Sequence, residues 1–99
     1  MAHVLIRQKV QDYNTWKTNF DDGAEDHRKA AGSKGGYVFR DVDDPNVVSI
    51  LLEWDNLENL NKFMGSLNSK EMQEMFKKSG VVGTPLAVHV FDSSEKTAL

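Results

Sequence analysis

The chain has 99 residues, of which 39% are hydrophobic and 27% charged, and its formal net charge is −3 at pH 7. This length and composition are typical of one globular domain, and the acidic balance argues against a nucleic-acid or anionic membrane partner. The sequence has no cysteine, which excludes disulfides, thiolate nucleophiles and zinc–thiolate sites.

The opening segment MAHVLIRQKV contains an apolar run that is too short for a signal peptide. No stretch of the sequence approaches the length of a membrane-spanning helix. Lysines and arginines are scattered rather than gathered in a basic stripe, which also disfavours nucleic acid as a partner. We therefore expect a cytoplasmic protein with no membrane partner.

Residues 3–10 are a predicted first strand, with three successive branched apolar residues at its centre. Asp12 is placed to cap the following helix, because its carboxylate can accept unpaired amide protons. The inward positions of this helix recur every three or four residues and therefore share one face. They are Tyr13, Trp16, Phe20, Ala24, His27 and Ala31. Gly32 is expected to end the helix.

Residues 37–42 and 47–54 are the next two predicted strands, joined by the turn Asp44-Pro45-Asn46 into a β-hairpin. A second helix is predicted to begin at a capping box of Asp55 and Glu58. We expect an interruption at residues 65–66, a restart at Asn68 with Glu71, and a stop at residues 79–80. Residues 86–91 are the predicted fourth strand.

The predicted order β-α-β-β-α-β indicates an α+β fold of the ferredoxin-like class, a four-stranded antiparallel sheet with both helices on one face. It occupies residues 1–92 as a single domain, and the polar segment 93–99 is a C-terminal tail. The third strand, VVSILLEW, is apolar on both faces, yet the helices can cover only one. We therefore predict that a second copy covers the other face, giving a homodimer. The alternative is that a few apolar side chains remain exposed.

His27 is the strongest single candidate for catalysis. Its place on the inward helical stripe would direct the imidazole between helix and sheet, where it could accept a proton from a phenol or an enolisable carbon. The alternative is a structural or surface histidine, which the neighbouring Asp26 and Arg28 favour. Arg7, Arg40 and Glu53 are charged residues on three strands, and a structural salt-bridge network is the interpretation favoured for them. The alternative is that an arginine binds a developing oxyanion, for which Arg40 is the candidate.

The large aromatic side chains could line a pocket for a flat aromatic ligand, or could simply be core. The candidate substrate-binding residues are Trp16, Phe20, Phe39, Trp54, Phe63 and Phe76. His3 and His89 lie on neighbouring predicted strands, but no metal-ligand spacing accompanies them. We expect no metal and no organic cofactor.

The chain resembles the dimeric α+β barrel superfamily, and above all small bacterial proteins of the antibiotic-biosynthesis-monooxygenase-like or cyclase-like type. The resemblance is carried by DYNTWK, HRKAAGSKGGYVFRDVDDPN, VVSILLEWDNLE and SGVVGTP. It implies a dimer of ferredoxin-like subunits whose two sheets form a shared barrel. Because this superfamily is functionally mixed, the resemblance specifies the fold more closely than the reaction.

The haem-degrading branch of the superfamily would imply a haem-ligating histidine on the second helix and an asparagine on the first strand. Residues 55–80 contain no histidine, and the first strand carries Arg7 and Gln8 at its polar positions. Haem degradation is therefore not expected.

The resemblance and the inward His27 together predict a cofactor-independent enzyme acting on an aromatic, polyketide-like or quinol-like substrate. The alternative is a non-catalytic dimeric protein that binds such a ligand or serves in a stress response. A purely structural oligomer is a third possibility. A ligand that binds without being converted would favour the non-catalytic protein over the enzyme.

Overall fold

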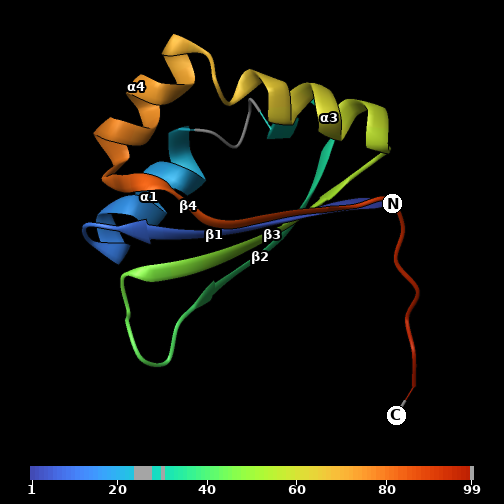
Figure 1. Ribbon diagram of the computed structural model, residues 1–99, viewed down its shortest axis with the longest axis horizontal. Coiled ribbons are helices and arrows are strands. Elements are labelled where there is room, and N and C mark those ends of the chain that lie inside the picture. Colours follow the sequence, from blue (N-terminus) through green and yellow to red (C-terminus); the bar gives the residue numbers. More distant parts are fainter. Residues whose placement is uncertain (24–27, 30, 99) are drawn as a thin grey trace.

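The computed structural model describes residues 1–23, 28, 29 and 31–98 of the chain. One antiparallel sheet contains four strands in the order β2-β3-β1-β4, and the helices shown in Figure 1 lie together on one face of it. The elements are β1 (Ala2–Val10), α1 (Tyr13–Gly23), β2 (Ser33–Arg40), β3 (Val47–Trp54), α3 (Leu57–Ser66), α4 (Lys70–Ser79) and β4 (Val81–Phe91). The predicted α+β, ferredoxin-like arrangement is confirmed.

Helix starts follow local side-chain chemistry. Asp12 caps α1 as predicted: its Oδ2 accepts the Thr15 amide proton at 2.9 Å, and this hydrogen bond lowers the pKa of the carboxyl. The caps of α3 and α4 each lie one residue later than predicted. Asn56 accepts from the Asn59 amide at 2.8 Å, and Ser69 accepts from that of Met72 at 3.2 Å.

The first strand of the β-hairpin, β2, starts earlier than predicted. β2 begins at Ser33 rather than residue 37, because Gly35 and Gly36 already pair with β3. A methyl group at Gly36 would lie 1.9 Å from the carbonyl oxygen of Leu51. The close approach of the two strands therefore requires glycine here.

β4 also begins earlier than predicted, at Val81 instead of residue 86. Val81 and Val82 pair with Val10 and Lys9, and the remainder of the strand pairs with β1 only from Ala87 onward. Residues 83–86, of which the first three precede the predicted strand, form an irregularity within β4. β4 is thus two paired segments on either side of a bulge.

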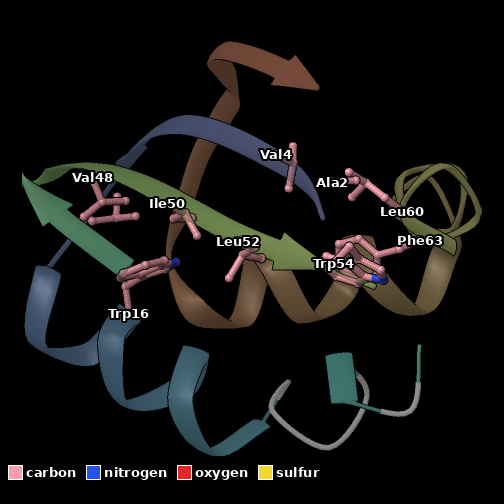
Figure 2. Close-up of a cluster of buried hydrophobic side chains, with 10 residues drawn as sticks. Ala2, Val4, Trp16, Val48, Ile50, Leu52, Trp54, Leu60 and Phe63 are labelled. Carbon is pink, nitrogen blue, oxygen red and sulfur yellow. The ribbon is translucent and has the colours of Figure 1, made fainter. Parts of the chain in front are cut away.

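The core lies between the sheet and the helices. Figure 2 shows Ile50 and Leu52 along β3, with Trp16 of α1 and Trp54 near opposite ends of that strand. Trp54 is fully buried against Phe63, with ring centroids 4.5 Å apart, and its indole nitrogen donates to the Ala31 carbonyl at 2.9 Å. The last residue of β3 is therefore hydrogen-bonded to the segment that precedes β2.

On the opposite face of the sheet lies no helix of the described segments (Figure 1). Cross-strand pairs Leu5–Leu51 and Tyr37–Leu51 place three apolar side chains together there. Tyr37 is 67% exposed and stacks on Phe39, itself 51% exposed, with ring centroids 5.9 Å apart. The two-faced apolar pattern predicted for β3 is thus present, with one face covered by helices and the other open.

Among the helices of the described segments, none is both long and apolar enough to cross a membrane.

Candidate functional site

A cavity of about 910 Å³ lies between the helices and the covered face of the sheet. Ligand sites for small organic molecules commonly measure about 300–1,000 Å³ and are largely apolar. The floor of this cavity is formed by sheet residues such as Ile6, Ile50 and Leu52, and its walls come from α1, α3 and α4. The volume and position suit one small organic molecule held between helix and sheet.

Aromatic side chains form much of the cavity wall. Trp16 and Phe20, one helical turn apart on α1, stack with ring centroids 4.9 Å apart and an interplanar angle of 27°. Phe63 of α3 and Phe76 of α4 face the same space. Four of the six aromatic residues predicted to bind substrate therefore line one cavity, and offset stacking on such rings favours a flat ligand.

Three of the four methionines also line the cavity: Met64, Met72 and Met75. Their unbranched thioether side chains can adjust to irregular shapes and make favourable contacts with aromatic rings. The α3–α4 side of the cavity is thus adaptable, whereas the α1 side presents a stacked aromatic pair.

Gln8 is the buried polar side chain on the floor, with only 5% of its surface exposed. Its Nε2 donates to the carbonyl oxygens of Lys9, at 2.9 Å, and Val82, at 3.0 Å. The second bond reaches across to β4 at the edge of its bulge. Gln8 therefore connects the cavity floor to the irregular part of β4.

Arg28 brings a positive charge to the cavity wall. Both terminal nitrogens of its guanidinium donate to the Phe20 carbonyl, at 3.2 and 3.1 Å, and its Cζ lies 3.9 Å from the centre of the Phe20 ring. Lys77 of α4 adds a second cationic lining residue. No aspartate or glutamate is found among the described residues that line this space. Arg28 and Lys77 thus give the described part of the lining two cationic side chains.

The other predicted site residues lie elsewhere. Trp54 is enclosed in the core and does not border the cavity, while Phe39 is on the open face of the sheet. Arg40 stacks over the Tyr13 ring, with Cζ 4.1 Å from its centre, and is not part of the lining. His27 lies outside the described residues.

The charged residues predicted as a network form separate pairs instead. Arg7 Nη2 donates to Asp41 at 2.7 Å, and His3 Nε2 lies 3.2 Å from a Glu53 carboxylate oxygen on the open face. His89 is two residues from Phe91 on β4. Within the described ranges, no three histidine, aspartate or glutamate side chains are close enough together to hold a metal ion.

Sequence reasoning did not identify Gln8 or Arg28 as site residues. A signal existed for Gln8, since strand alternation places it on the same face as Val4 and Ile6. Arg28 offered no such signal. Its position depends on the carbonyl of Phe20, eight residues earlier, which no local sequence pattern specifies.

The fold is shared with several solved structures. A proposed antibiotic biosynthesis monooxygenase from Deinococcus radiodurans is 16% identical, with a TM-score of 0.66, covering 100% of this chain and 98% of its own. Proposed antibiotic biosynthesis monooxygenases from Bordetella bronchiseptica and Caulobacter crescentus are each 18% identical, with TM-scores of 0.67. The former covers 99% of this chain and 97% of its own, and the latter 95% and 90%.

No family model and no curated protein matches the sequence. At identities of this size, the structural likeness shows a common fold. The expected resemblance to proteins of the antibiotic-biosynthesis-monooxygenase type is therefore confirmed for the fold.

Proposed function

We propose that this chain is a small-molecule enzyme of the antibiotic-biosynthesis-monooxygenase-like or cyclase-like type. Its substrate is an aromatic, polyketide-like or quinol-like molecule, converted without a metal or organic cofactor. The observation that carries the proposal is the cavity of about 910 Å³ walled by Trp16, Phe20, Phe63 and Phe76. The shared fold with proposed antibiotic biosynthesis monooxygenases supports the same reaction class.

The lining suits a substrate that becomes anionic during the reaction. Removing a proton from a phenol or an enolisable carbon leaves a delocalised anion, and a fixed cation lowers the energy of that anion. Arg28 is the arginine of the cavity lining, so we assign it the anion-stabilising role first considered for Arg40. His27, the residue before it in sequence, is the proposed base.

The anion can then react in one of two ways. In a monooxygenase reaction the anion adds to dioxygen and, once protonated, gives a hydroperoxide. Loss of water breaks the O–O bond and leaves a new C=O group, so that the substrate itself supplies both hydrogens and both electrons needed to form the water (CH2 + O2 → C=O + H2O). In a cyclase reaction the carbanion attacks a carbonyl carbon of the same molecule, whose oxygen takes up the proton. Enclosure by apolar walls strengthens the electrostatic contribution of Arg28 in either reaction.

Binding is tested by tryptophan fluorescence during titration with the flavonol quercetin. Trp16 lines the cavity and Trp54 does not, so Trp54→Phe should keep ligand-dependent quenching and Trp16→Phe should lose most of it. Quenching that depends on Trp54 alone would contradict binding in this cavity.

Catalysis is tested with 1,4-naphthoquinol by following oxygen consumption and product formation above the uncatalysed rate. His27→Ala should lower the enzymatic rate while the protein still binds quercetin. An unchanged rate would reject His27 as the base. Binding without any conversion of quinol, flavonol or polyketide-like compounds would instead support the non-catalytic ligand-binding alternative.

We also propose that a second copy of the chain covers the open sheet face, giving a homodimer. The support is the apolar surface formed by Leu5, Leu51, Tyr37 and Phe39, which is larger than the single exposed side chains common on monomers. The same patch on both copies would make a two-fold, self-complementary interface.

A further inference from the structure

Toward the described residues, the side chain of Gln8 forms hydrogen bonds only through its amide hydrogens. Both Nε2 bonds go to main-chain carbonyl oxygens, those of Lys9 and Val82, at 2.9 and 3.0 Å. Turning the amide around would direct its oxygen at two acceptors and lose both bonds. The orientation of the side chain is therefore fixed by its surroundings.

The oxygen of Gln8 remains available. None of the described residues donates a hydrogen bond to Oε1, although an amide oxygen has two lone pairs. Among the side-chain nitrogen and oxygen atoms of the described residues, His3 Nδ1 is the one that has neither contact with solvent nor a hydrogen-bond partner. Gln8 Oε1 also lacks a partner, so this oxygen must be accessible to solvent. Because the residue is 95% buried and borders the cavity, the accessible space beside it is the cavity.

We infer that Gln8 Oε1 accepts a hydrogen bond from a hydroxyl group of the bound aromatic molecule. An amide oxygen can only accept, so a phenol that keeps its proton fits, whereas a phenolate, a carbonyl or a methyl ether finds no donor there. Apolar neighbours such as Ile6, Ile50 and Val88 make an unused polar group costly at this position.

The inference also orients the ligand, and it rests on the proposed function. The Gln8 side of the ligand keeps a neutral hydroxyl on the cavity floor. The Arg28 side of the cavity, which is less deeply buried, receives the group that becomes negative. The cavity thus selects molecules with a phenolic hydroxyl placed apart from the group that loses its proton.

The test compares 2-naphthol with 2-methylnaphthalene, which replaces the hydroxyl with a methyl group of similar size. Isothermal titration should show 2-naphthol binding about tenfold more tightly, as expected for one hydrogen bond made in an apolar site. 2-Methoxynaphthalene should bind no better than the methyl compound, because its oxygen cannot donate.

Two variants make the comparison specific. Gln8→Met keeps the length of the side chain but removes the acceptor, so the preference for 2-naphthol should disappear. Gln73→Met is the matched control. Gln73 also lines the cavity but is exposed and donates to the Leu67 carbonyl, so its variant should keep the tenfold preference.

If both compounds bind the wild-type protein equally, the role of Gln8 is refuted while aromatic binding stands. If neither binds, the proposed function fails and this inference fails with it. Should Gln8→Met not fold, the ¹³Cδ signal of Gln8 in the wild-type protein decides. It should move on addition of 2-naphthol and stay in place with 2-methylnaphthalene, and equal shifts would overturn the inference.

Discussion

The side-chain nitrogen of Gln8 donates to the carbonyl oxygen of Val82 at 3.0 Å, where β4 departs from regular pairing with β1. A bulge leaves main-chain groups without ladder partners, and this side chain satisfies one of them. The same contact holds Gln8 at the floor of the cavity. One side chain therefore joins the irregular strand to the candidate site.

Replacing Gln8 with leucine should destabilise the protein, because the Lys9 and Val82 carbonyls each lose a donor. We expect the free energy of unfolding to fall by about 1–3 kcal/mol, measured by urea denaturation. Gln73→Leu, at an exposed position, should change it by less than about 0.5 kcal/mol. Equal effects of the two substitutions would show that the Gln8 bonds do not support the bulge.

Gly36 and Gly65 should respond in opposite directions to substitution by alanine. A Cβ at Gly36 would collide with the Leu51 carbonyl, so Gly36→Ala should cost about 2–4 kcal/mol of unfolding free energy. Gly65, in α3, has open space around it, and Gly65→Ala should stabilise the helix by about 0.5 kcal/mol. Thermal denaturation of both variants checks the strand approach, and a harmless Gly36→Ala would contradict it.

Arg28 should contribute to the binding of anionic aromatic ligands. Its guanidinium lies over the Phe20 ring at the cavity wall, whereas that of Arg40 lies over Tyr13, outside the lining. Arg28→Met should weaken binding of 2-naphthoate by roughly tenfold, because a charge-assisted contact is lost. Arg40→Met should leave the affinity unchanged. The reverse pattern, measured by isothermal titration, would return the anion-binding role to Arg40.

A charge placed on the open sheet face should dissociate the proposed dimer. Leu51 lies at the centre of this face, opposite Leu5 and Tyr37, so Leu51→Asp would bury a carboxylate between two copies. Light scattering after size exclusion should give a dimer for the wild-type protein and a monomer for the variant. Leu57→Asp, at the start of α3 on the helical side, should remain dimeric. A wild-type protein that is monomeric at micromolar concentration would refute the interface.

Local chemistry made most of the fold predictable. The Asp12 cap, the Asp44-Pro45-Asn46 turn and the apolar runs of β1 and β3 each follow from neighbouring residues. The early start of β4 did not, because the pairing of Val81 and Val82 depends on β1 and not on their own neighbours. Glycine, threonine and proline at residues 83–85 give the same local pattern in a turn and in a bulge.

The candidate site was predictable only in part. Helical spacing placed Trp16 and Phe20 on one face, and both line the cavity. The run YVF in β2 is apolar on both faces, so its pattern could not assign Phe39 to the open side. Trp16 and Trp54 are both buried, but Trp16 borders the cavity and Trp54 does not, a difference that depends on how α3 packs across the end of β3.

The central claim is that a flat aromatic molecule binds between the helices and the sheet, and methionine methyl NMR tests it most directly. The protein has four methionines, of which Met64, Met72 and Met75 line the cavity, while Met1 is 51% exposed at the other end of the chain. Titration of ¹³C-methyl-methionine protein with 2-naphthol should shift the three cavity signals and leave that of Met1 in place. Unchanged cavity signals at saturating ligand, or a shift confined to Met1, would contradict the account.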